Sequence, residues 1–279
     1  MAVFERPIFI MAPPRSGTTL LFDLCARAPG LWTIGGESHA VIEGMNHLHP
    51  SNRGWESNRL TAADADRGTV QRLVSRFLVR LRDRDGRLPT HYAGLRLLEK
   101  TPRNCLRLPF LAAAFPDAQF VYLYREPRDT VSSMLDAWRS GKFIAYDGLP
   151  DWPAPAWSLL LIPGWRDLIG KELAEAVARQ WAVATECLLD DFETLPLERR
   201  CVLTYERLIS EPQAEIERLC AWSGLEWDRE LTTPLPLSKT VLTPPEAGKW
   251  RRNGEELGRV MPLVEDTVRR SRTMAGAQS

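Results

Sequence analysis

The chain has 279 residues, of which 44% are hydrophobic and 26% are charged, a composition that excludes a disordered or fibrous protein. Its 36 basic and 36 acidic residues leave no formal net charge, so no global field attracts nucleic acid or an anionic membrane. Five singly scattered cysteines predict reduced thiols in a cytoplasmic protein, and no apolar run is long enough for a membrane span or fits a signal peptide.

Strand-like and helix-like segments alternate along the chain, which is the pattern of an α/β protein. An apolar run at 8–11 stops at a Pro-Pro pair, and a helical pattern follows it from Thr18. Later runs of strand length lie at 94–98, 120–124 and 200–203, and helical patterns cover 69–84, 105–114, 127–138, 171–190, 214–222 and 254–270. Because strands that are apolar throughout are buried on both faces, we predict a central parallel β-sheet flanked by helices, and the length of 1–279 allows one large domain or two small ones.

Two irregular segments interrupt this alternation. Residues 42–66 are polar and include His47, His49 and Trp55, and residues 141–169 are rich in proline, glycine and tryptophan. Long irregular segments in α/β domains are often lids or substrate walls, so these two are candidate walls of an acceptor site. Ordinary surface connections with buried aromatic side chains are the alternative.

The strongest local signal is the sequence PPRSGTT at residues 13–19, between a buried strand and a helix. Backbone N–H groups at such a helix start, together with the helix dipole, form a cradle for an anion. Arg15 adds a full charge, Gly17 allows close approach to the backbone, and the threonine hydroxyls can donate to oxygens. The loop is similar to a Walker A motif, but Thr18 stands where the lysine that reaches a γ-phosphate would be.

This loop resembles the 5′-phosphosulfate loop of sulfotransferases that use 3′-phosphoadenosine 5′-phosphosulfate (PAPS), in the branch with tyrosylprotein sulfotransferases and many bacterial members. The resemblance assigns binding of the phosphosulfate to Arg15, Ser16, Gly17, Thr18 and Thr19. It implies a P-loop-like three-layer fold and a single sulfotransferase domain. It also implies PAPS as the co-substrate, 3′-phosphoadenosine 5′-phosphate (PAP) as the product, and no metal.

Three later segments follow the family in the same order. Arg125 follows a predicted strand and Ser133 lies eight positions on, as in the family's 3′-phosphate element. An arginine at the carboxyl edge of a parallel sheet can grip a phosphate through paired donors, although a surface ion pair with a neighbouring carboxylate is the alternative. Tyr205 resembles the tyrosine beside the nucleotide, and Lys249 and Trp250 resemble the loop that closes over PAPS.

Sulfuryl transfer is an in-line displacement that needs a base for the acceptor proton and cations facing the leaving phosphate. The resemblance points to Glu37, in the run GGESH, as the base. Burial would raise the pKa of this carboxyl and Arg15 would lower it, and the sequence leaves open which effect is larger. His39 is the rival base, because an imidazole titrates near neutral pH. Cytosolic family members use a histidine two positions after a lysine, but Pro102 stands at that position here, after Lys100 and Thr101.

Lys100 and Ser238 complete the predicted catalytic residues. Lys100 would join Arg15 as a cation on the bridging oxygen, or else form a salt bridge with Glu99. Ser238 resembles a family serine that helps hold the transferring group.

Several alternatives stay open. His47 and His49, with His39 nearby, could ligate zinc, but no fourth ligand is evident. An ATP-dependent small-molecule kinase on the same fold and a non-catalytic PAP-binding protein are the rival functions. The predicted partner is a small-molecule or peptide acceptor with a hydroxyl or amine, and no nucleic acid; the sequence does not identify the acceptor or the oligomeric state.

Overall fold

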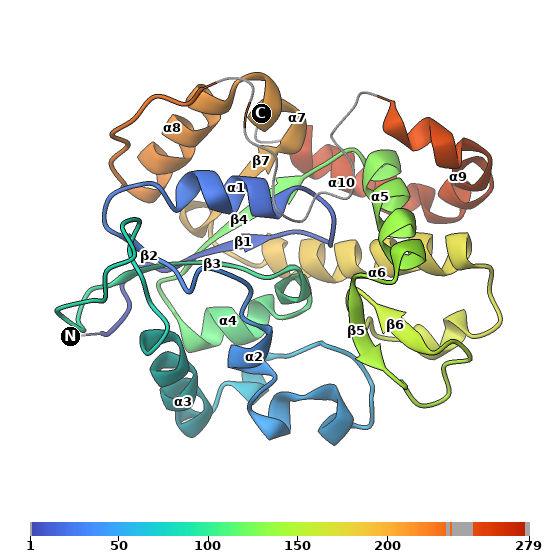
Figure 1. Cartoon of the computed structure of the whole chain (residues 1–279), viewed down its shortest axis with the longest axis horizontal. Coiled ribbons are helices and arrows are strands. Elements are labelled where there is room, and N and C mark those ends of the chain that lie inside the picture. Colours follow the sequence, from blue (N-terminus) through green and yellow to red (C-terminus); the bar gives the residue numbers. More distant parts are fainter. Residues whose placement is uncertain (1, 233–234, 236–247, 277–279) are drawn as a thin grey trace.

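A five-stranded parallel sheet forms the centre of the protein (Figure 1), and the computed structural model describes residues 2–232, 235 and 248–276. The strand order is β2-β3-β1-β4-β7, so β1 lies between β3 and β4. The strands are β1 (Ile8–Met11), β2 (Leu31–Trp32), β3 (Arg96–Lys100), β4 (Gln119–Tyr124) and β7 (Arg200–Thr204).

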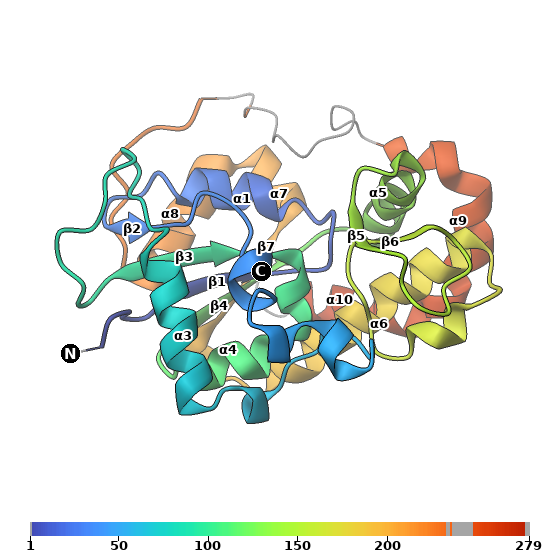
Figure 2. The same ribbon diagram turned by 60° about the horizontal axis from the view of Figure 1, so that its bottom comes forward.

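Helices cover both faces of this sheet (Figure 2). They are α1 (Thr18–Cys25), α2 (His39–Ile42), α3 (Arg67–Leu78), α4 (Leu108–Ala114), α5 (Pro127–Ser140), α6 (Leu173–Glu193), α7 (Tyr205–Ser210), α8 (Pro212–Ser223), α9 (Gly254–Val260) and α10 (Glu265–Gly276). Helices α1, α7 and α8 lie on one face, and α3, α4 and α6 lie on the other. This is the predicted three-layer arrangement.

Alternate side chains of each strand enter different cores, because successive residues of a strand point to opposite faces. In β1, Ile8 and Ile10 pack in the cluster that includes α1 and α8. Phe9 and Met11 belong to the cluster on the other face, with α4 and α6. Burial on both sides explains why the central strands are apolar throughout.

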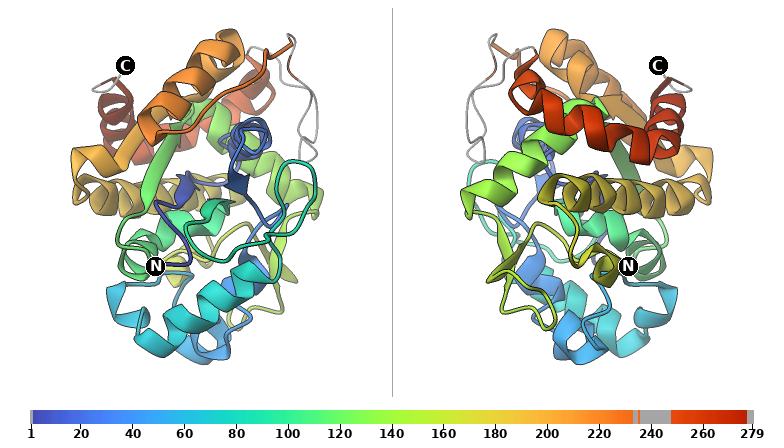
Figure 3. Two further views of the ribbon diagram at one scale, coloured as in Figure 1. Left: turned by 90° about the vertical axis from the view of Figure 1, so that its left-hand side faces the viewer. Right: turned by 90° about the vertical axis from the view of Figure 1, so that its right-hand side faces the viewer.

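The region from 254 to 270 differs from the single predicted helix. It contains α9 and α10, separated by a 3-10 turn at Met261–Val264. Pro262 accounts for the break, because proline lacks the N–H that a continuous helix needs. Figure 3 shows α9 and α10 beside α6, and a third apolar cluster joins α5, α6 and α9. The predicted helix at 105–114 likewise begins later, after a 3-10 turn at Pro102–Leu106.

The segment 141–169 contains a hairpin that the sequence did not predict. Its antiparallel strands are β5 (Ile144–Asp147) and β6 (Ala156–Ser158). A group of tryptophan rings packs around it, edge to face except for the tilted pair Trp138–Trp152, with centroids 4.7 Å to 6.4 Å apart: Trp138, Trp152, Trp157 and Trp165. The hairpin is therefore held to α5 by aromatic packing.

Within the described ranges, no helix has the length and apolar character that crossing a bilayer requires. All five cysteines are free thiols, and four of them are buried.

Candidate active site

Three neighbouring strands end at the same edge of the sheet, and each brings a predicted site residue there. The loop 13–19 follows β1, Lys100 is the last residue of β3, and Arg125 directly follows β4. Since β3, β1 and β4 are parallel neighbours, their carboxyl ends meet. Segments far apart in the sequence thus form one polar site.

The loop 13–19 has the backbone of an anion cradle. Arg15 and Gly17 both have a left-handed conformation, with φ angles of 69° and 93°. Ser16 Oγ donates to the carbonyl of Pro13 at 2.9 Å, which fixes the turn. Gly17 is the N-cap of α1, and in the described chain no side chain caps this helix. A helix start without a side-chain cap is a place where an anion can act as the cap.

Gly17 also lies against a predicted nucleotide-binding residue. A Cβ on Gly17 would be 2.4 Å and 2.5 Å from Cδ2 and Cε2 of Tyr205. The guanidinium of Arg125 stacks on the same Tyr205 ring, with its Cζ 4.6 Å from the ring centroid. The glycine thus allows the tyrosine to approach the phosphate loop.

The predicted 5′-phosphosulfate and 3′-phosphate anchors touch each other. Arg15 Nε donates to Ser133 Oγ at 3.3 Å, and Arg125 donates to the carbonyl of Arg15 at 2.9 Å. Phe143, at the start of the hairpin, packs on the guanidinium of Arg15 at 4.6 Å. Burial and the charge of Arg125 lower the pKa of Arg15. A bound anion would therefore offset the repulsion between these two positive charges.

The remaining predicted nucleotide contacts lie near this positive region. Burial, and then the charges of neighbouring arginines including Arg125 and Arg15, lower the pKa of Lys249. The ring of Trp250 contacts both Arg128 and Arg251, whose Cζ atoms are 5.5 Å and 5.4 Å from its centroid. Ser238 lies outside the described residues.

Lys100 and Glu37 form an ion pair next to the phosphate loop. Lys100 Nζ lies 2.6 Å from Glu37 Oε1 and donates to Thr19 Oγ1 at 3.1 Å. The side chain of Lys100 is 4% exposed, and that of Glu37 is 32% exposed. Glu99, the alternative partner of Lys100 in the sequence analysis, instead accepts hydrogen bonds from Thr101 and Asn104. This is expected because successive residues of a strand point to opposite faces of the sheet.

The second oxygen of Glu37 contacts His39. His39 Nε2 and Glu37 Oε2 are 2.7 Å apart. Burial opposes the charged carboxylate, but the hydrogen bonds and charges of His39 and Lys100 outweigh it and lower the pKa of Glu37 to about 2. The carboxylate is therefore ionised at neutral pH, and while Lys100 pairs with it, it is a weak base.

A buried network that the sequence analysis missed holds the Glu37 loop. The backbone N–H of Ser38 donates to Thr101 Oγ1 at 2.7 Å, and this hydroxyl donates to Glu99 Oε1 at 2.5 Å. Asn104 donates to the other oxygen of Glu99 at 2.7 Å. The sequence did carry a signal for this network, since Glu99 is a carboxylate inside a strand of the central sheet. A fully buried glutamate needs hydrogen-bond partners such as these.

The two irregular segments 42–66 and 141–169 meet at a second buried carboxylate. Glu43 accepts from Arg103 at 2.6 Å, from Arg107, and from the hydroxyl of Tyr146 at 3.1 Å. Burial opposes its charge, but the two arginines lower the pKa of Glu43 to about 2. The ring of Trp55 lies 5.3 Å from that of Tyr146, so both segments contribute aromatic side chains here.

The histidines considered as zinc ligands have other partners. His47 Nε2 is 2.9 Å from Thr69 Oγ1, and His49 Nδ1 is 2.7 Å from Ser51 Oγ. Across the described residues, no group of three or more His, Cys, Asp and Glu side chains is placed to hold a metal ion.

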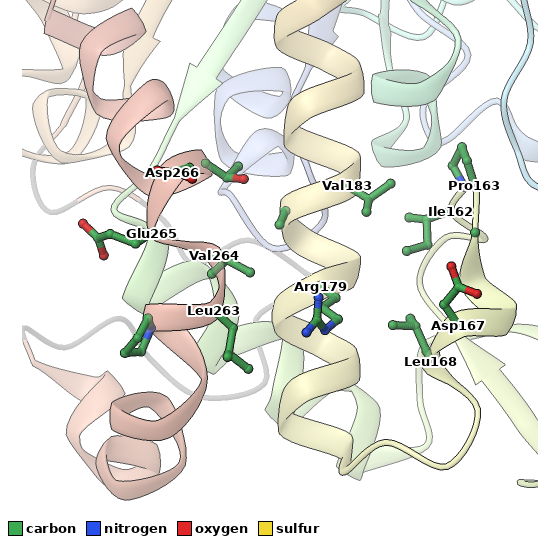
Figure 4. A pocket seen from close by; sticks show the side chains of 14 residues that line it. Ile162, Pro163, Asp167, Leu168, Arg179, Val183, Leu263, Val264, Glu265 and Asp266 are labelled. Carbon is green, nitrogen blue, oxygen red and sulfur yellow. The ribbon is translucent and has the colours of Figure 1, made fainter.

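A pocket of about 560 Å³ lies beside α6 (Figure 4). It is lined by residues of α6 together with 162–168 and 262–267. Val183 and Arg179 enter it from α6, opposite Leu168 and Asp167. It contains none of the predicted site residues.

Taken together, an uncapped helix start after a buried strand, two adjacent arginine anchors and a Lys–Glu pair define the class of protein. They are features of an α/β protein that binds a phosphate-bearing ligand at the carboxyl edge of its sheet.

Residues 7–229 match the sulfotransferase family, and the chain belongs to that family. It is 26% identical to protein-tyrosine sulfotransferase A of Caenorhabditis elegans, over 79% of this chain and 50% of the relative. It is 28% identical to nodulation protein NoeE of Sinorhizobium fredii, again over 79% of this chain and 50% of the relative. The chain thus spans about half the length of these two relatives.

A solved structure supports the fold. The sulfotransferase domain from the curacin biosynthetic pathway matches with a TM-score of 0.50 and 19% identity, over 80% of this chain and 75% of that chain. The predicted family and the predicted α/β fold are confirmed.

Proposed function

We propose that this protein transfers a sulfuryl group from PAPS to a hydroxyl or amine acceptor, with Glu37 as the base. The observation that carries the proposal is the pairing of Glu37 with Lys100 beside Thr19, at the start of the phosphate-loop helix. A base and a cation are the two groups that in-line sulfuryl transfer needs. Membership of the sulfotransferase family supports this reading.

The residues divide the work as follows. Arg15 and the loop from Ser16 to Thr19 hold the phosphosulfate, while Arg125 and Ser133 hold the 3′-phosphate. The contacts between Arg15 and Ser133 and between Arg125 and the carbonyl of Arg15 suit a ligand with two phosphate groups close together. Tyr205, Lys249 and Trp250 line the nucleotide, and Ser238 is assigned to the transferring group by the resemblance alone.

Binding of PAPS turns Glu37 into a better base. Lys100 Nζ, now paired with Glu37, is drawn to the bridging oxygen, where negative charge develops as the phosphate leaves. Loss of this cation raises the pKa of Glu37 from its low value of about 2 and frees Oε1 for the acceptor. The pair therefore links arrival of the co-substrate to activation of the base.

The acceptor is a small molecule or a peptide, bound against the segments 42–66 and 141–169. Phe143 on Arg15, together with Tyr146 and Trp55, supports an apolar or ring-bearing acceptor. One of the two relatives described above, protein-tyrosine sulfotransferase A, bears a name that specifies protein tyrosine as its substrate. A tyrosine-containing peptide is therefore the first acceptor to test, before phenols and sugars.

The test is release of PAP from PAPS by Glu37→Gln and Lys100→Ala, in parallel with PAP affinity. Each variant is expected to lose about 10²-fold to 10³-fold in turnover, with PAP affinity largely kept. An ion pair outside the candidate site offers matched controls: Lys171, just before α6, lies 3.3 Å from Glu175 in the first turn of that helix, and Lys171→Ala and Glu175→Gln should behave as wild type. Wild-type turnover in Glu37→Gln would remove Glu37 from the mechanism.

Thermal stability measured with each nucleotide, together with turnover, separates the rival functions. A kinase should be stabilised against heat by ATP and Mg²⁺, whereas the proposed enzyme should be stabilised by PAP and not by ATP and Mg²⁺. PAP binding without turnover on any acceptor would favour the non-catalytic PAP-binding protein.

A further inference from the structure

Glu37 is held at both carboxylate oxygens, by two residues of different chemistry. Lys100 Nζ lies 2.6 Å from Oε1, and His39 Nε2 lies 2.7 Å from Oε2. An ionised carboxylate can only accept, so the proton of this hydrogen bond belongs to His39 Nε2. The two contacts fix the plane of the carboxylate, with Oε1 on the side of the phosphate loop.

The groups around His39 keep its imidazole neutral. Arg103, in the 3-10 turn after β3, and Arg107, directly after that turn, face it with positive charge, and Glu43, directly after α2, offsets part of that charge. From α3, the guanidinium of Arg76 donates to the carbonyl of Ala40, next to His39. Burial first, and then the two arginines, lower the pKa of His39, although its bond to Glu37 opposes them.

The same geometry makes His39 a poor base. Its Nε2 already carries the proton that it donates to Glu37, so this atom has no lone pair for an acceptor proton. Its Nδ1 is buried and has no hydrogen-bond partner in the part of the chain that the structure describes. With Nε2 as a neutral donor and Nδ1 buried, His39 is suited to orient Glu37 and not to accept a proton itself.

We propose that His39 is a positioning residue for Glu37, which holds Oε2 so that Oε1 is presented to the acceptor hydroxyl beside the phosphate loop. The inference rests on the proposed function of Glu37. In the step that it serves, the acceptor O–H bond breaks and its proton passes to Glu37 Oε1. The electron pair on the acceptor oxygen forms the new bond to sulfur, and the bond from sulfur to the bridging oxygen breaks, its electron pair leaving with PAP.

Two variants separate positioning from other roles. His39→Ala removes the donor and lets the carboxylate rotate, so kcat is expected to fall by about 10-fold to 10²-fold, the scale at which small misplacements act. His39→Gln restores an N–H donor at nearly the same place and should stay within about 3-fold of wild type, a loss well below that scale. Neither change touches a phosphate anchor, so PAP affinity should be unchanged in both.

The pH profile gives a readout that a purely structural role would not move. An imidazolium 2.7 Å from Glu37 would weaken it as a base, so wild-type kcat should fall on the acid side as His39 becomes protonated, below its ordinary pKa of 6.5. Glutamine does not titrate, and in His39→Gln this acid-side fall should therefore move to lower pH.

A measurement without any acceptor completes the test. In the PAP complex at neutral pH, ¹⁵N NMR of labelled histidine should show His39 as the neutral tautomer with its proton on Nε2. An imidazolium or a proton on Nδ1 would overturn the inference, as would wild-type kcat in His39→Ala or equal loss in His39→Gln and His39→Ala. Loss of PAP affinity and stability in both variants would mark His39 as structural, whereas wild-type turnover in Glu37→Gln would instead overturn the proposed function.

Discussion

Substitution of Gly17 by alanine tests the contact on which the phosphate loop depends. The φ angle of 93° at Gly17 is left-handed, and any residue with a Cβ costs about 1–2 kcal/mol there. The new Cβ would also lie 2.4 Å from the Tyr205 ring, which must move and lose its stacking with Arg125, for about 0.5–1 kcal/mol more. The free energy of unfolding should therefore fall by about 1.5–3 kcal/mol.

Gly30→Ala is the matched control for this experiment. Gly30 has a φ angle of 77°, and a Cβ there would meet nothing within 4 Å, so only the backbone cost of about 1–2 kcal/mol applies. Urea denaturation gives both values, and calorimetry with PAP gives the affinities. Gly17→Ala should lose PAP affinity and Gly30→Ala should not. Equal destabilisation by the two variants, with PAP affinity kept in both, would refute the reasoning.

Two further predictions concern the buried carboxylates. Because the pKa of Glu43 is lowered from 4.5 to about 2, its stabilisation is complete above pH 4.5 and is lost as the pH falls toward 2. Glu43→Gln should therefore cost about 3 kcal/mol at neutral pH and flatten the acid-side loss of stability seen by urea denaturation; a wild-type acid profile would contradict this. Thr101→Val should cost about 1–3 kcal/mol by leaving Glu99 with one partner fewer, and should also lower kcat because Ser38 loses its anchor; unchanged stability would show that the Thr101 hydroxyl is not needed.

The sheet could be read from the sequence where burial on both faces leaves a strong pattern. The predicted strand 8–11 is β1, and 120–124 and 200–203 fall within β4 and β7. In contrast, β2 has two residues, too few for any periodic signal, and pairing with β3 defines it. The β5–β6 hairpin was hidden by its proline and tryptophan content, since tertiary packing of the rings, not alternation along the strand, holds it in place.

The candidate site likewise has a part that the sequence predicts and a part that it does not. Residues tied to a strand end, such as Lys100 and Arg125, could be placed at the sheet edge from the sequence, because parallel strands share that edge. Contacts between distant segments could not be predicted. Lys100 meets Glu37 across 63 residues, and Arg15 meets Ser133 across 118. Such pairings depend on the relative positions of a loop and a helix, which no local pattern encodes.

The most direct test of a PAPS-dependent site is calorimetric titration of PAP, without metal, into wild type and Arg125→Ala. Wild type should bind saturably, and the variant should lose about 10-fold to 10²-fold in affinity, as expected when a hydrogen bond to a charged phosphate is removed. Arg269→Ala, on α10 and paired with Asp266 in an exposed ion pair, is the matched control and should bind as wild type. Absence of binding by wild type, or equal affinity in Arg125→Ala, would contradict the assignment of the 3′-phosphate anchor and with it the proposed function.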